Sequence, residues 1–234
     1  MNSKLGLKTL AHTIQIALLF LGWFECTAHA ESATRKASSA SPDKNWEYRV
    51  IKRHKEPVGA LCKGGTNESV LDLTFDYGDH IREQMLGEAE NSAVIWAPDS
   101  KRFAFNRWDG PQISRVLFFQ LQHGNWVGLQ SPDDKIDAFF VRVLAAEKVR
   151  KQLSAPPTGH WDCVKVSEWT DDDTALLRAV GTLDTDWESV ARGFVFTIKF
   201  DAEGNWKIVA SEPLSKEETE RLGSVHSHLL KLAQ

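Results

Sequence analysis

The feature that most constrains this chain is a hairpin signature at residues 94–105, VIWAPDSKRFAF. Trp96 leads into a turn on Pro98-Asp99, and Phe103 and Phe105 alternate along the segment that follows. Proline suits the second position of a type I turn, and aspartate can hydrogen-bond the local backbone. Strand side chains alternate between faces, so the two phenylalanines share one face. The stretch predicts two antiparallel strands, with Trp96 in the core and Asp99 holding the turn.

Strand patterns occur on both sides of this hairpin. Residues 113–122 (ISRVLFFQLQ) have an apolar middle, which is typical of a central strand buried on both faces. Pro57 to Gly65 contains three glycines and is predicted to be a loop. The other segments with strand character are residues 46–51, 69–75, 80–86, 102–108, 126–129, 162–169, 174–183, 193–200 and 206–210.

Two segments have helical character. In the first, Ser131 suits the N-cap and Pro132 the first helical position, and apolar residues then recur at helical spacing up to about residue 154. In the second, Ser215 and Glu218 form a capping box that predicts a helix to about residue 232.

The order of elements is the same in the two halves of the chain, about 93–155 and 162–233. Trp96 aligns with Trp169, 73 residues later, and a Gly-Asn-Trp triplet ends the third strand in both halves. Any two β-meanders can share such residues, but strand order, turn chemistry and terminal helix recur together here. We therefore expect a mainly β (α+β) fold, with antiparallel meanders in two related units, each followed by an α-helix. The sheets would be open or packed as an incomplete propeller.

Residues 94–105 resemble the W-S-P-D-G-K-x-I-A-F signature of WD40-like (TolB-type) β-propeller repeats. Residues 166–177 (VSEWTDDDTALL) are a degenerate second copy that keeps the tryptophan and an aspartate. A propeller needs several blades of about 40 residues, whereas this chain has two good copies, each with a helix after it. The resemblance implies a β-hairpin with a tight turn that contains aspartate, and it implies no binding function.

The N-terminal 30 residues have the pattern of a signal peptide. Lys4 and Lys8 precede an apolar run at residues 14–24, and Ala28-His29-Ala30 suits signal peptidase. The alternative is an uncleaved anchor helix. Residues 31–44 are small and polar, which predicts a disordered linker, and residues 45–234 would form one globular domain. The mature chain would be periplasmic or secreted, with no further segment of membrane-spanning length.

The formal net charge of −4 argues against a nucleic-acid partner, which requires a basic surface. After signal cleavage the cysteines would be Cys62 and Cys163. An even number of cysteines in an exported chain favours a disulfide. The alternatives are two inert buried thiols, or a nucleophile at Cys163 with His160 three residues before it.

No established catalytic motif is present. His80, His160 and Asp162 are weak catalytic candidates because loops could bring them together as an acid–base group. The acidic cluster at residues 171–173 lacks the spacing of a calcium loop and is predicted to be a solvated turn. We expect neither a metal site nor a cofactor.

The tryptophans divide into two sets. Those at matched places in the two halves are predicted to be core residues; they are Trp96, Trp126, Trp169 and Trp206. Three others lie in or beside predicted loops and are candidates for protein or glycan contacts; they are Trp108, Trp161 and Trp187.

These features favour a non-enzymatic exported protein that binds a protein or glycan of the cell envelope. Two alternatives stay open. One is a secreted hydrolase with a site built from loops around His80, His160 and Asp162, and the other is a carbohydrate-binding module that uses loop tryptophans.

Overall fold

The computed structural model describes residues 39–53, 56–74, 92–108, 114–151, 158–184 and 189–222. The chain divides into two units, Met1–Arg35 and Lys36–Gln234, and every described residue lies in the second. Within the described ranges, no helix is both long enough and apolar enough to cross a membrane. The predicted signal peptide lies outside these ranges. Residues 39–44 of the predicted linker are described: Ser41 is buried and its N–H donates to the carbonyl of Trp46, so the folded part begins before residue 45.

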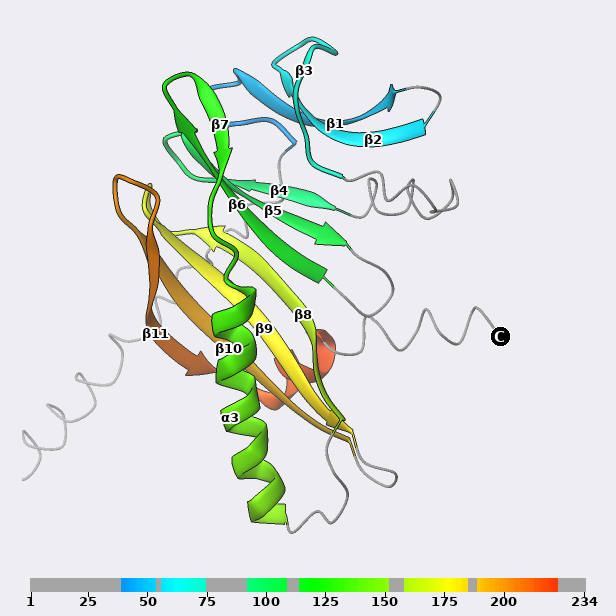
Figure 1. The fold of residues 1–234 in the computed structure, drawn as a ribbon, viewed down its shortest axis with the longest axis vertical. Helices are drawn as coiled ribbons and strands as arrows, with labels where there is room; N and C mark the ends of the chain where they lie inside the picture. Colours follow the sequence, from blue (N-terminus) through cyan, green and yellow to red (C-terminus); the bar gives the residue numbers. More distant parts are fainter. Residues whose placement is uncertain are drawn as a thin grey trace, which may run out of the picture. The chain divides into compact units, whose positions relative to one another are not determined.

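The first sheet contains β1 (Trp46–Arg53), β2 (Glu56–Lys63) and β3 (Ser69–Asp72), antiparallel in the order β1-β2-β3 (Figure 1). The loop prediction for residues 57–65 was wrong over most of its length, because β2 occupies it to Lys63. Gly59 is required for packing and not for a turn: a Cβ there would lie 2.4 Å from the Tyr48 hydroxyl oxygen.

The middle sheet contains β4 (Ala93–Trp96), β5 (Arg102–Trp108), β6 (Ser114–Gln122) and β7 (Asn125–Gly128), in the order β4-β5-β6-β7. The β4–β5 turn is held as predicted, since the Lys101 N–H donates to the Asp99 carboxylate at 2.9 Å. The β6–β7 turn has positive φ at His123 and Gly124, as a two-residue type I′ hairpin requires.

Apolar side chains on both faces of the middle sheet are buried, mainly those of β5 and β6. Trp96, Phe103 and Phe105 pack in one apolar cluster with Leu61 and Leu73 of the preceding segment. On the opposite face, Ala104, Val116 and Phe118 belong to a second cluster, which includes residues of the last sheet and of helix α3. The prediction that β6 is a central strand is confirmed, because it lies inside the sheet and contributes to both clusters.

The last sheet is a second meander, formed by β8 (Thr158–Trp169), β9 (Thr174–Asp184), β10 (Ser189–Phe200) and β11 (Trp206–Pro213), in the order β11-β10-β9-β8. Each four-stranded meander is followed by a helix: α3 (Asp133–Lys151) after β7, and a helix from residue 216 after β11, described as far as residue 222. The expected mainly β fold of antiparallel meanders with helices is confirmed. The three sheets of the described residues are open, and no closed barrel or ring occurs among them.

Helix α3 begins as predicted, with the Asp133 N–H donating to the Ser131 hydroxyl at 3.3 Å. Its buried side chains are Ile136, Phe140 and Leu144, which pack against the last sheet (Figure 1). Phe140 lies over Gly181 of β9, where a Cβ would be only 2.5 Å from the ring.

Polar side chains of the middle sheet bind the edge strand β8. The Asn106 amide donates to the carbonyl of Val166 at 2.8 Å and accepts the Val166 N–H at 2.9 Å. The Ser114 hydroxyl bonds the carbonyl and the N–H of Val164, both at 3.2 Å. These two side chains therefore supply backbone partners that an edge strand would otherwise lack.

Arg102 of β5 joins the middle sheet to two turns of the last sheet. It is buried, and its guanidinium donates to the carbonyls of Asp172 at 3.0 Å and Asp201 at 2.7 Å. Its Nε also donates to the Gln120 side chain at 3.3 Å. The arginine of the hairpin signature thus has a structural role.

Candidate functional site

The side chains of the predicted catalytic group lie outside those that the structure describes. His160 and Asp162 lie on β8, where the His160 backbone pairs with Thr182 and Asp162 falls at a β-bulge. Their side chains are not among those described, and His80 lies outside the described residues. Nothing described links the three.

The predicted binding tryptophans are also placed only in part. Trp108 is half-buried at the end of β5, and its backbone N–H donates to the Ser92 hydroxyl at 3.0 Å. Trp161 pairs with Gly181 through the backbone, with its side chain undescribed, and Trp187 lies outside the described residues.

The matched tryptophans are core residues, as predicted. Trp96, Trp169 and Trp206 are buried, and Trp126 packs half-buried against the first cluster. The indole N–H of Trp169 donates to the Ile95 carbonyl at 3.0 Å, and that of Trp206 donates to the Gln130 carbonyl at 2.8 Å. Both bonds connect the second half of the chain to the first.

The predicted disulfide is not seen: Cys62 and Cys163 are both buried, and no bond joins their sulfur atoms. Cys62 lies on β2 of the first sheet and Cys163 on β8 of the last, so the middle sheet separates their strands. The even number of cysteines, on which the disulfide prediction rested, could not reveal this separation.

The acidic cluster forms a turn exposed to solvent. Asp171 accepts the Asp173 N–H at 3.0 Å, and Asp173 lies 3.8 Å from the Lys199 ammonium. Among the described residues, no group of three or more His, Cys, Asp or Glu side chains is arranged to hold a metal ion.

A groove of about 490 Å³ lies where three segments that are distant in the chain meet. The end of α3 supplies Lys151, and the first half of β10 supplies residues 190–194. The end of β11 supplies Pro213, and the segment after it supplies Leu214 and residues of the following helix. Sequence reasoning missed the groove because no local pattern shows that these segments meet.

The floor of the groove depends on a bare backbone at Gly193. A Cβ there would lie 2.6 Å from the Thr219 hydroxyl and 2.9 Å from Leu214 Cδ1. The Leu214 N–H donates to the Gly193 carbonyl at 2.9 Å. The lone glycine inside the alternating pattern of β10 was the signal in the sequence for this close approach.

One wall of the groove is positioned by an ion-pair network. Arg192 lies 2.7 Å from the Glu147 carboxylate of α3, which also binds Arg150 at 2.6 Å. The hydrogen bond from Arg150, followed by that from Arg192, lowers the pKa of Glu147. The Glu147 side chain is only 17% exposed, and its ion pair holds the Arg192 guanidinium against α3.

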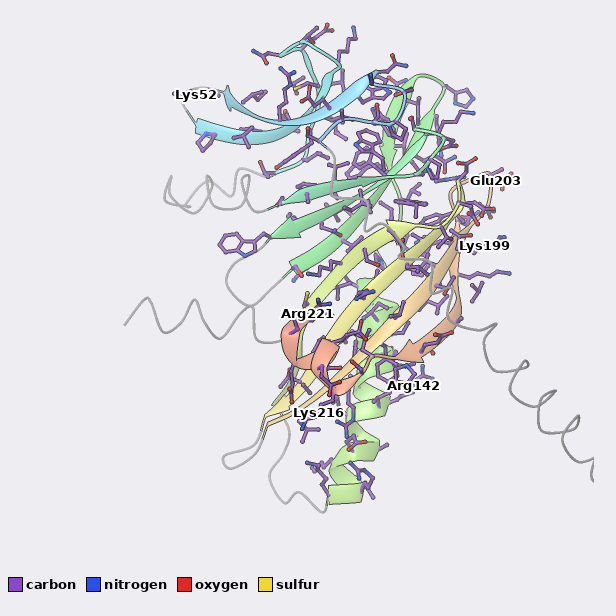
Figure 2. All side chains as sticks on the ribbon, turned by 180° about the vertical axis from the view of Figure 1, so that it is seen from behind. Lys52, Arg142, Lys199, Glu203, Lys216 and Arg221 are labelled. Atoms are coloured by element: carbon purple, nitrogen blue, oxygen red, sulfur yellow. The ribbon has the colours of Figure 1, made fainter. Side chains whose placement is uncertain are left out.

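The other wall begins the last helix. The predicted capping box is present, with the Glu218 N–H donating to the Ser215 hydroxyl at 3.1 Å and the Glu218 carboxylate accepting the Ser215 N–H at 3.4 Å. Lys216 follows, with its side chain 83% exposed and its ammonium 3.7 Å from Glu220 (Figure 2). The groove is therefore lined by three cations and one carboxylate above an apolar floor.

Comparison with known proteins adds no identity: no family model, curated protein or solved structure matches the chain.

Proposed function

We propose that the chain is an exported, non-enzymatic binding protein of the cell envelope. Its groove would hold an anionic group carried on an apolar segment of another envelope protein. The observation that carries the proposal is the pairing of Lys151, Arg192 and Lys216 with a floor that includes Phe194 and Leu214. Export is the sequence expectation from residues 1–30.

The size of the groove suits a short segment better than a folded surface. Its volume of about 490 Å³ falls within the range of ligand pockets, roughly 300–1,000 Å³. A peptide C-terminus with an apolar last residue combines a carboxylate for the cations with a side chain for the floor. The cations would then bind the C-terminal carboxylate of the peptide, and the floor would bind the side chain of the same last residue.

The test uses two labelled peptides with the same apolar sequence, one with a free C-terminal carboxylate and one amidated. Fluorescence anisotropy should show binding of the free acid and at least about tenfold weaker binding of the amide. Lys216→Glu should weaken binding of the free acid, because it reverses a charge at the rim of the groove.

Lys52→Glu is the matched control, since Lys52 is an exposed lysine on β1 of the first sheet (Figure 2). It should leave the affinity unchanged. Equal binding of the two peptides would show that the carboxylate is not recognised, and equal weakening by the two lysine variants would show non-specific charge attraction. Either result would overturn the proposal.

The hydrolase and glycan-binding alternatives rest on side chains outside the described set, apart from half-buried Trp108. The described residues therefore favour neither alternative. A hydrolase substrate screen and a glycan array test them separately from the peptide experiment.

A further inference from the structure

The outer face of α3 carries apolar side chains in contact with solvent. Val141 is 61% exposed and Val149 78% exposed, the two highest values among the large hydrophobic side chains of the described residues. Ala138 and Ala145 are exposed on the same helix. Scattered surface valines are ordinary, but these two belong to one helix with exposed alanines between them.

These four residues form one stripe. Their spacings of three and four residues place them along one side of the helix over about 16 Å. The opposite side carries Ile136, Phe140 and Leu144, which pack against the last sheet. Figure 1 shows α3 lying along that sheet, with its other side turned away from it. The helix is therefore apolar on two sides, and among the described residues only the side with Ile136, Phe140 and Leu144 is covered by other elements.

Charges along α3 are arranged so that the helix complements an antiparallel copy of itself. Asp134 and Asp137 lie towards its start, and Lys148 and Arg150 towards its end. This order stabilises the helix dipole within one chain. In an antiparallel pair of identical helices, it also sets the acidic end of each helix beside the basic end of the other.

Charge and apolar contacts agree on one register. Ala138 and Val149 are eleven residues apart, which is about three helical turns, and Asp137 and Lys148 have the same separation. In an antiparallel pair the numbers of facing residues have a constant sum, which is 287 when Ala138 faces Val149 of a second copy. The sum for Asp137 and Lys148 is 285, so Asp137 lies within two residues, or about 3 Å along the axis, of Lys148 of that copy. The small alanines allow close approach of the two helices.

We infer that two copies of this chain associate through the outer faces of α3, packed antiparallel about a two-fold axis. Such an interface is self-complementary, because the same patch serves both copies. A helix of 19 residues spans about 28 Å, so the contact lies at the small end of specific interfaces, below about 1,200 Å². The dimer is therefore weak, with a dissociation constant in the micromolar range.

Sedimentation velocity tests the inference on the exported protein as the cell processes it, from about 1 to about 200 µM, a range that brackets a micromolar dissociation constant. The wild type should shift from monomer to dimer across this range. Val141→Asp and Val149→Asp should each weaken dimerisation at least about tenfold, because each places a charge in the apolar stripe.

Val209→Asp is the matched control, since Val209 is 47% exposed on β11, away from α3. It should dimerise like the wild type, and circular dichroism should show that all three variants fold. A wild type that stays monomeric throughout, or equal weakening by Val209→Asp, would overturn the inference.

A charge reversal separates pairing between copies from the helix dipole. Asp137→Lys and Lys148→Asp should each weaken the dimer, because each sets like charges beside one another. The double variant should restore it, because the two 137–148 pairs related by the two-fold axis then have opposite charges again. The dipole alone predicts the opposite, since the double variant opposes it twice. A double variant that associates no better than the single variants would exclude the antiparallel register.

Discussion

At the scale of single residues, side chains of β5 and β6 act as backbone partners for β8. Asn106 and Ser114 together bond the N–H and carbonyl groups of Val164 and Val166, at 2.8 to 3.2 Å. The bonds matter because both valines are buried, and a buried backbone group left without a partner is costly. Polar side chains thus determine how one strand of the last sheet is held.

Asn106→Leu tests this role. It keeps a similar volume but leaves the N–H and carbonyl of Val166 without their partner, so we expect the free energy of unfolding to fall by about 2–3 kcal/mol. Urea denaturation measures the loss. Asn125→Leu, at an exposed position at the start of β7, should change stability by less than about 0.5 kcal/mol. Similar losses in the two variants would contradict a specific role for Asn106.

At the scale of elements, α3 is positioned by aromatic packing on β9 and β10 and by one ion pair. Phe140 covers Gly181 of β9. The neighbouring Phe139 packs edge-on against Phe194 and Phe196 of β10, with ring centroids 4.8 and 4.9 Å apart. The helix also connects to β10 through the bond between Glu147 and Arg192. A shift of α3 would therefore change both its packing and a wall of the groove.

Gly181→Ala should destabilise the protein by about 2 kcal/mol, because the new methyl group would overlap the Phe140 ring. In a Phe140→Ala background the same change should cost much less, and thermal or urea unfolding of the four proteins gives the coupling energy. Gly128→Ala is the matched control: its Cβ would lie 3.7 Å from Phe119, an ordinary contact. Additive effects of Gly181→Ala and Phe140→Ala would show that the ring is not the obstacle.

At the scale of the whole described chain, two apolar clusters on opposite faces of the middle sheet connect the three sheets. Hydrogen bonds from Arg102, Trp169 and Trp206 add links between the halves. No disulfide joins the first sheet to the last among the described residues. Packing and hydrogen bonds are therefore the connections that the structure provides between them.

We expect two reduced thiols, and no disulfide, in the chain from residue 31 onwards. Because Cys62 and Cys163 are both buried, a thiol reagent should react slowly with the native protein and should modify both after denaturation without reductant. Addition of reductant should leave the count unchanged. A rise from zero to two thiols on reduction would show that the cysteines pair after all.

Much of the local structure was predictable because short-range chemistry determines it. The Asp99 turn, the β6–β7 hairpin, the Ser131 cap and the Ser215–Glu218 capping box all follow from residues within a few positions of one another. β2 was missed because Gly59 was read as turn punctuation, whereas its role is to admit Tyr48 from another strand. The groove was missed for the same reason, because Gly193 is needed only for the close approach of Leu214 and Thr219.

The sequence by itself determined the strands, turns and helices around VIWAPDSKRFAF, and their order in two successive meanders, because periodicity and turn preferences act over a few residues. Only the tertiary structure decided which surfaces meet. It placed Arg102 on two distant turns, kept Cys62 and Cys163 in different sheets, and brought the end of α3 to β10. Such contacts depend on the combined packing of many side chains far apart in the chain, which no local pattern records.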